Sequence, residues 1–178
     1  MILSYITGRL GNQLFEYAYA RSLLLKRGKN EELILNFSLV RAAGKEIEGF
    51  DDNLRYFNVY SYTELDKDIV LSKGDLLQLF ILFKLDQKLF RIIKKEKWFS
   101  FFRRFGIIFQ DYLDNISNLI IPRTKNVFCY GKYENPKYFD DIRSILLKEF
   151  TPRTPPLKNN DQLYSVIEST NSVCISIR

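Results

Sequence analysis

The sequence predicts an α/β layered domain, and the beginning of the chain carries most of that prediction. A strand and loop over Met1–Gly11 lead into a helix over about Asn12–Lys26, and a second strand follows over Leu33–Phe37. Strands and helices that alternate in this way are typical of domains in which helices cover a sheet. The 178 residues are 46% hydrophobic and 15% aromatic, enough to bury the core of one domain, or of one domain and part of another.

The first helix is expected from its apolar residues and from its end. A broad apolar band indicates a mostly buried helix, and it consists of Leu14, Phe15, Tyr17, Ala18, Tyr19, Ala20, Leu23, Leu24 and Leu25. The band is followed by Lys26-Arg27-Gly28, and cations followed by glycine are common at the C-terminus of a helix.

Two glycines, Gly8 and Gly11, stand in the loop before this helix. Glycine lets the backbone turn sharply and approach a ligand closely, and a helix that opens there offers unpaired N–H groups to an anion. Arg9 adds a planar fork of donors that suits phosphate. The same pattern occurs where glycine serves only the packing of a helix on a sheet, so the motif alone leaves both interpretations open. The G-x-x-G spacing and the asparagine at the end of the second strand disfavour NAD.

The later elements are expected from shorter patterns. Leu39–Lys73 has no clear period, and Arg41–Gly44 within it is expected to be a loop. Asp75–Phe105 is expected to form one or two helices, with a break near Ser100 or Gly106. Val127–Gly131 is expected to form a strand and turn, and Asn135-Pro136 to open a helix that continues to about Glu149.

Three prolines divide the chain. We expect a first domain over 1–150, a linker over 151–160, and the beginning of a second domain over 161–178. In that last part, Asp161 is expected to cap a short helix, and Val173–Ile177 to form a buried strand.

The chain has no histidine, which excludes Ser-His-Asp and Cys-His catalysis and any histidine metal site built from these residues. Its two cysteines, Cys129 and Cys174, lie in apolar, strand-like surroundings and are expected to be buried, inert thiols in a reducing compartment. The pairs Asp51-Asp52 and Asp140-Asp141 are interpreted as capping or solvated residues rather than a metal site, because a hard cation needs several converging oxygens.

The positive charge of the chain is concentrated in one segment. Lys84–Arg104 holds eight cations and two anions, a net charge of +6 that equals that of the whole chain, interleaved with aromatic and aliphatic residues. An amphipathic helix with solvated charges is the favoured interpretation, ahead of peripheral contact with anionic lipid. Nucleic-acid binding is the weakest of the three, since no known motif accompanies the charge. The longest uncharged run here, Leu76–Phe83, is too short to span a bilayer, and Met1–Ser4 does not resemble a signal peptide.

Three segments of the chain, in order, resemble a known family. They are Gly8–Arg21, with the string G-R-L-G-N-Q-L-F-E-Y-A, Tyr130–Ile142, and the terminal Val173–Arg178. Together they are similar to the α-1,2-fucosyltransferases, glycosyltransferase family eleven.

The resemblance implies a GT-B-type glycosyltransferase with two Rossmann-like halves, of which this chain holds the first and is truncated at the start of the second. It implies an inverting, metal-independent transfer of L-fucose from GDP-fucose, the donor substrate, to the 2-hydroxyl of a galactosyl acceptor on a glycan, with no cofactor.

The resemblance also indicates site residues. Arg178 matches the first arginine of the family's H-x-R-R-G-D motif, whose arginines hold the donor pyrophosphate, while Ser176 stands where histidine is usual and the rest of the motif is absent. Arg178 and Arg9 are therefore the expected catalytic residues, and the 178-residue chain alone is expected to be inactive. The residues expected to line the cleft from the facing half are Gly8, Arg9, Gly11, Asn12 and Gln13.

Two other classes stay open at this point: a different nucleotide-using α/β enzyme, and a non-catalytic α/β domain that binds a glycan or a partner. The expected location is the cytoplasm, and no nucleic-acid partner is expected. Peripheral attachment to the inner membrane face through Lys84–Arg104 stays open as the second interpretation of that segment.

Overall fold

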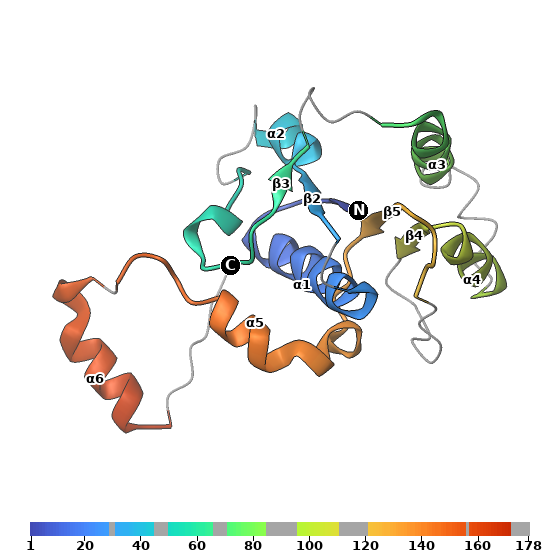
Figure 1. The fold of residues 1–178 in the computed structure, drawn as a ribbon. Helices are drawn as coiled ribbons and strands as arrows, with labels where there is room; N and C mark the ends of the chain where they lie inside the picture. Colours follow the sequence, from blue (N-terminus) through green and yellow to red (C-terminus); the bar gives the residue numbers. More distant parts are fainter. Residues whose placement is uncertain are drawn as a thin grey trace.

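The computed structural model describes residues 1–28, 31–44, 50–65, 71–84, 96–110, 121–155 and 157–171. Helices and strands alternate along the chain and build an α/β domain around one sheet (Figure 1). In order, the elements are β1 (Ile2–Tyr5), α1 (Leu10–Arg27), β2 (Leu33–Asn36), α2 (Ser38–Gly44), η1 (Leu54–Tyr56), β3 (Thr63–Glu64), α3 (Lys73–Lys84), α4 (Glu96–Arg104), β4 (Ile107–Gln110), β5 (Val127–Gly131), η4 (Pro136–Tyr138), η5 (Asp140–Ile142), α5 (Arg143–Glu149), η6 (Lys158–Asn160) and α6 (Asp161–Ser169).

The sheet has the strand order β3-β2-β1-β5-β4, and all four pairs are parallel. In the central strand, Ser4 lies opposite Leu35 of β2 and Cys129 of β5. The prediction of an α/β domain is confirmed, and a parallel sheet flanked by helices is compatible with a Rossmann-like fold.

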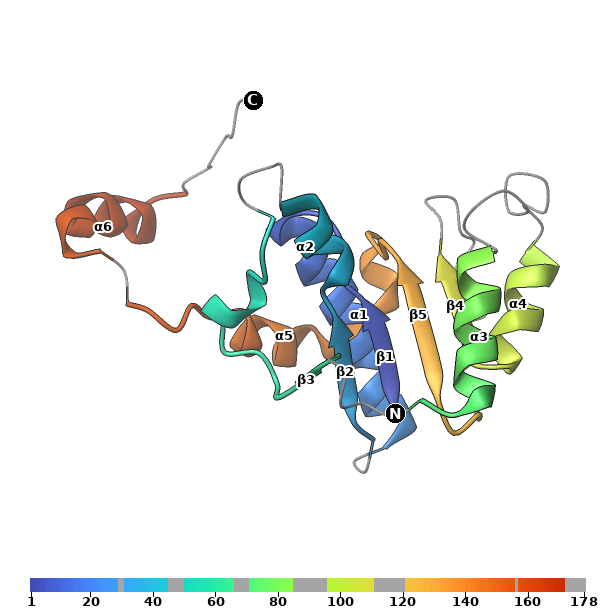
Figure 2. The ribbon, with the colours of Figure 1, turned by 90° about the horizontal axis from the view of Figure 1, so that it is seen from above.

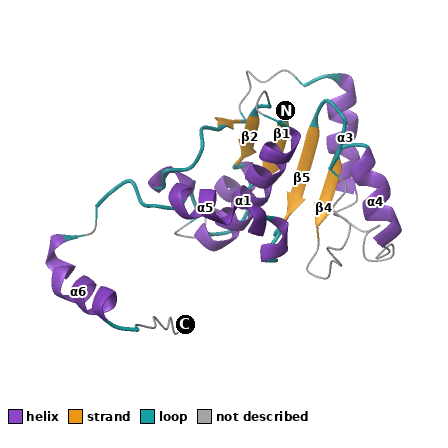
Figure 3. Ribbon diagram, turned by 60° about the horizontal axis from the view of Figure 1, so that its bottom comes forward, coloured by secondary structure: helices purple, strands orange, loops and turns teal. Residues whose placement is uncertain are grey.

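Alternate residues of β1 enter two separate cores. Ile2 and Ile6 pack with residues of α1 and α5, whereas Leu3 and Tyr5 pack with residues of α3. Successive side chains of a strand point to opposite faces of the sheet, so neighbouring residues of β1 enter different cores. Because both faces are covered, the strands are apolar on both faces. Figures 2 and 3 show α1 and α5 on one side of the sheet and α3 with α4 on the other.

Helix α1 begins two residues earlier than expected. Arg9 is extended, with φ −92° and ψ −178°, and Leu10 is the first helical residue, so the second glycine of the loop lies inside the helix. The expected end is confirmed, since the N–H of Gly28 donates to the carbonyl of Leu24 at 3.1 Å after two cations in the last turn.

The helix expected after Pro136 is interrupted. The Asn135 side chain accepts a hydrogen bond from the N–H of Lys137 at 3.1 Å and caps a 3-10 turn, as the sequence predicts. Phe139 then leaves the helical region, with φ −145° and ψ 13°, so two 3-10 turns precede α5.

The middle of the chain differs from the expectation in its short elements. The described residues of the range 75–105 form two helices, as one of the alternatives allowed, but the strands β3 and β4 were not expected. The expected loop over Arg41–Gly44 is wrong, because these residues belong to α2. Of the amphipathic helix expected over Lys84–Arg104, the structure describes the end of α3 and the helix α4, and residues 85–95 lie outside the described part.

The first residues of the expected linker pack on the domain. The N–H of Asn58 donates to the carbonyl of Thr151 at 3.0 Å, and the N–H of Arg153 donates to the carbonyl of Tyr56 at 2.8 Å. Helix α6 then stands apart from the sheet (Figures 1 and 2). The expected short helix is confirmed, but the expected cap is wrong: Asp161 is the first residue of α6, Asn160 is the N-cap, and no side-chain cap is formed.

Cys129 is buried, and burial raises the pKa of its thiol to about 12, which fits the expected inert thiol. Cys174 and the expected strand Val173–Ile177 lie outside the described residues. In the described part of the chain, no helix combines the length and apolar character needed to cross a membrane.

Candidate functional site

The loop between β1 and α1 lies where the strand order changes direction. β2 and β3 follow on one side of β1, and β5 and β4 lie on the other. Parallel sheets of this kind bind ligands outside the carboxyl ends of their strands, next to such a point. The loop after β1 and the loop after β5 therefore border the place where this fold is expected to hold a ligand.

The two glycines of the loop have different structural roles. Gly8 has φ +65°, and a Cβ added there would lie 2.5 Å from Nδ2 of Asn12, so the turn requires glycine. Gly11 is exposed in the first turn of α1, and a Cβ added there would meet no atom within 4 Å. The backbone conformation of the turn therefore explains Gly8, whereas neither the conformation nor the packing of the described residues requires glycine at position 11.

The N-terminus of α1 is open. No side chain caps it, and the N–H of Gln13, which donates to the carbonyl of Arg9 at 3.2 Å, begins the intrahelical ladder. The helix is 18 residues long, so its first N–H groups present the positive end of a full helix dipole. Such an end can bind phosphate or carboxylate oxygens.

Arg9 stands beside this helix end. Its side chain is exposed, and its guanidinium lies 5.4 Å from the centre of the Phe50 ring. Among the described residues no carboxylate forms an ion pair with Arg9.

Gln13 is fully buried and uses its amide within the fold. Its Nε2 donates to the carbonyls of Gly8 at 3.1 Å and Asp51 at 2.7 Å, and its Oε1 accepts from the N–H of Asn53 at 2.9 Å. Gln13 thus ties the glycine loop to the segment 51–53, while Asn12 is half-buried and closer to solvent. The amide offered to a ligand is that of Asn12 rather than that of Gln13.

Glu16 is a residue of this region that the sequence analysis did not select. It is fully buried, and its two carboxyl oxygens accept from the N–H of Thr7, at 2.6 Å, and from the hydroxyl of Thr7. Burial raises the pKa of this carboxyl to about 8, and the bonds from Thr7 oppose the shift, as does the charge of Lys132, while Glu134 adds to it. The sequence did contain a signal for this residue, because a single carboxylate within an apolar helical band indicates a buried acid that needs hydrogen-bond partners.

The loop after β5 also has unusual backbone conformations. Gly131 has φ +153°, and Tyr133 is a non-glycine residue with φ +48°. Tyr133 is buried and stacks on Tyr19 of α1 with ring centres 4.0 Å apart. Residues held in sparsely populated regions are common at functional sites, where packing must offset a strain of about 1–3 kcal/mol.

Two of the three segments that carry the family resemblance contact each other in the fold. Tyr19 from the first segment lies against Tyr133 and Tyr138 of the second, and Phe15 lies 6.1 Å from Phe139 between ring centres. The third segment, with Arg178, lies outside the described residues, so the structure does not place it relative to the loop.

The aspartate pairs have local structural roles. Asp52 accepts from the N–H of Leu54 at 3.0 Å, and Asp51 pairs with Arg55 at 2.6 Å. Asp141 pairs with Lys26 at 3.1 Å. No cluster of three or more residues suited to metal ligation occurs within the described ranges.

Comparison of the chain with protein-family models, curated proteins and solved structures gives no significant match.

Proposed function

We propose that this chain is the amino-terminal, Rossmann-like half of a GT-B-type α-1,2-fucosyltransferase, which transfers L-fucose from GDP-fucose to the 2-hydroxyl of a galactosyl acceptor. The family is suggested by the sequence of the loop and of the segment after β5. What the structure adds in support is the position of that loop at the carboxyl edge of a parallel sheet, next to an open helix N-terminus.

The observation that carries the proposal is Gly11. Glycine within a helix costs about 0.5–1 kcal/mol of stability relative to alanine, and a Cβ added at Gly11 would meet no atom within 4 Å. A glycine that packing does not require is expected where a ligand approaches the backbone closely.

The chemistry needs negative charge to be stabilised on the leaving group. The acceptor 2-hydroxyl gives up its proton to a general base, which none of the residues named here supplies, and its oxygen attacks the anomeric carbon of fucose from the face opposite GDP. The bond between that carbon and the β-phosphate oxygen breaks, GDP leaves with the electron pair, and the configuration inverts. Charge grows on the departing diphosphate, which N–H groups at the start of α1 and the guanidinium of Arg9 can stabilise in a water-poor cleft. Arg178 is proposed to act on the same diphosphate from the facing half.

Of the other residues of the site, Asn12 is proposed to contact the ligand, and Gln13 and Glu16 are proposed to hold the loop in place. Asn12 offers its amide to a sugar hydroxyl or a phosphate oxygen. Gln13 and Glu16 hold the loop, because their polar atoms already bond to its backbone and to Thr7. In the proposed site, the diphosphate is bound by preorganised backbone N–H groups rather than by a metal ion.

The proposal is tested by titrating the 15N-labelled chain with GDP-fucose, GDP, UDP-galactose, NAD and a galactosyl glycan, and following the amide resonances of Leu10, Gly11 and Asn12 by NMR. We expect GDP and GDP-fucose to shift these three resonances at lower concentration than the other two nucleotides do. Equal shifts with NAD would favour a different nucleotide-using enzyme. Shifts with a galactosyl glycan and none with GDP-fucose would favour a non-catalytic binding domain.

A further inference from the structure

A cavity lies at the amino edge of the sheet, between α3, α4 and the segments that lead into β4 and β5. Its volume is about 510 Å³, within the roughly 300–1,000 Å³ of typical ligand pockets. Among the described residues, none that was selected for the proposed transferase site lines this cavity.

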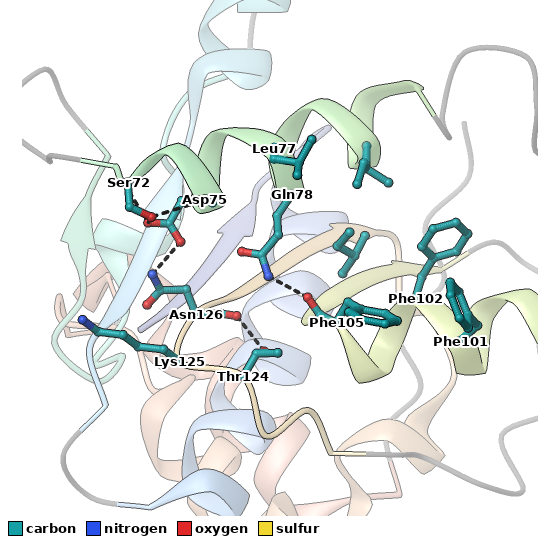
Figure 4. A pocket seen from close by; sticks show the side chains of 13 residues that line it. Ser72, Asp75, Leu77, Gln78, Phe101, Phe102, Phe105, Thr124, Lys125 and Asn126 are labelled. Carbon is teal, nitrogen blue, oxygen red and sulfur yellow. Dashed lines mark hydrogen bonds between the residues drawn. The ribbon is translucent and has the colours of Figure 1, made fainter.

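The cavity has a polar end and an apolar end. Figure 4 shows Ser72, Asp75, Asn126 and Lys125 together at one end, and the three aromatic side chains of α4 and the turn after it at the other. Asp75 is the only acidic residue among the described lining residues, and its oxygens already accept from Asn126 Nδ2 at 2.6 Å and from Ser72 Oγ at 2.7 Å.

The walls of the cavity are tied together. Nε2 of Gln78, on α3, donates to the carbonyl of Phe105, just after α4, at 2.6 Å. Leu79 and Leu82, also on α3, are buried in the core beneath. This bond joins α3 to the turn after α4, and the two leucines anchor α3 on the sheet.

Large apolar side chains stay exposed around the apolar end. Leu77 is 59% exposed, Phe101 49% and Phe105 53%, and on the adjoining face of α3, Leu76 is 53% and Phe80 58% exposed. Apolar side chains gathered in this number on one surface indicate contact with a partner or a membrane.

The charge around the cavity selects between these partners. Lys73 on α3, Arg104 on α4 and Lys125 at the polar end are exposed. Exposed aromatic and aliphatic side chains among cations are the composition that binds anionic lipid surfaces.

We propose that this cavity docks the chain on an anionic phospholipid bilayer, with acyl chains entering between α3 and α4 at the apolar end and the lipid phosphate beside Lys125 at the polar end. The proposal does not depend on fucosyl transfer, because it rests on a different edge of the sheet and on different residues.

The test uses the full chain and vesicles of phosphatidylcholine with or without phosphatidylglycerol. Trp98, the single tryptophan, lies in α4, so its emission reports on this region. We expect the chain to float with phosphatidylglycerol vesicles at low salt, the Trp98 emission to shift to shorter wavelength, and lipids with brominated chains to quench it. Added salt should weaken the binding, since charges at a surface are screened within about 10 Å at 0.1 M.

Matched variants locate the contact. Leu77→Glu should weaken vesicle binding by about tenfold or more, whereas Leu163→Glu, at a leucine of α6 that is 56% exposed, should not. Lys125→Glu should weaken it and Lys158→Glu, at an exposed lysine before α6, should not. Circular dichroism verifies that each variant is folded.

Three results would overturn the proposal. They are the absence of binding to phosphatidylglycerol vesicles at low salt, equal effects of Leu77→Glu and Leu163→Glu, and self-association in sedimentation equilibrium that Leu77→Glu abolishes while vesicles bind neither protein.

Discussion

Substitutions at Gly11 are expected to change the stability of the fold and the affinity for GDP in opposite directions. It is the second residue of α1, and a Cβ there meets no atom within 4 Å. Replacing Gly11 by alanine should therefore stabilise the fold by about 0.5–1 kcal/mol, because alanine loses less backbone entropy in a helix. For a chain of this length, this corresponds to a rise in Tm of roughly 1–4 °C.

Ligand binding should change in the opposite direction. Leucine has nearly the helix propensity of alanine, so Gly11→Leu should match Gly11→Ala in stability while placing a larger side chain beside the open N–H groups. We expect GDP affinity to fall by about threefold in Gly11→Ala and by about tenfold or more in Gly11→Leu, where a tenfold change is 1.4 kcal/mol. Thermal unfolding and calorimetric titration with GDP measure the two quantities.

Gly74 is the matched control. It is the second residue of α3, and a Cβ added there would meet only Ser72 Oγ, at an ordinary contact distance of 3.7 Å. Gly74→Ala should raise Tm in the same way without changing GDP affinity. The reasoning is refuted if the Gly11 variants are less stable than the parent, which would mean that the space is filled. It is equally refuted if they are more stable and bind GDP unchanged.

Two other residues of the site give further predictions. Arg9→Ala should lower the specificity constant for GDP-fucose in the intact enzyme by the equivalent of about 1.5–4 kcal/mol, and Arg9→Lys should restore part of the loss. The control Arg143→Ala, at an exposed arginine, should leave the constant unchanged. An unchanged constant in Arg9→Ala would mean that the loop has only a structural role. Because the pKa of Glu16 is about 8 in the fold and 4.5 in the reference state, the unfolded chain releases this proton first as pH rises, so the free energy of unfolding should fall by about 3–5 kcal/mol between pH 5 and pH 8. Urea unfolding of Glu16→Gln should lack this component, and the same slope in the variant and the parent would contradict the assignment.

The beginning of the chain could be predicted because local and long-range signals agree there. The apolar run of β1, the glycine turn and the apolar band of α1 each require the same strand, loop and helix. The start of α1 was misplaced by two residues because Arg9 is no usual N-cap, and no capping side chain marks the boundary.

The missed elements depend on contacts that are distant in the sequence. β4 is only four residues long and is held as an edge strand by pairing with β5 about twenty residues later. β3 has two residues, and its partner β2 supplies the pairing. Short strands of this kind have no period of their own, so their existence follows from the sheet rather than from local sequence.

The candidate site was predictable in composition but not in the roles of its residues. Gly8, Arg9 and Asn12 lie where the motif places them, at an exposed loop and helix start. The burial of Gln13 against Asp51 and Asn53 requires a contact across some forty residues, which the motif does not contain. The raised pKa of a buried acid likewise depends on what covers it, and a sequence does not show this.

The two proposed sites lie at opposite edges of one sheet, and this arrangement gives a final prediction. The glycine loop follows the carboxyl end of β1, whereas the lipid cavity is lined by Ile107 and Asn126, at the amino ends of β4 and β5. A strand of five residues rises about 3.3 Å per residue, so the edges are about 15 Å apart. GDP and anionic vesicles should therefore bind together: Leu77→Glu should leave GDP affinity unchanged, and vesicles should not displace GDP. Competition between GDP and vesicles in a flotation assay would mean that lipid reaches the carboxyl edge, and that the α3–α4 cavity is not where the membrane binds.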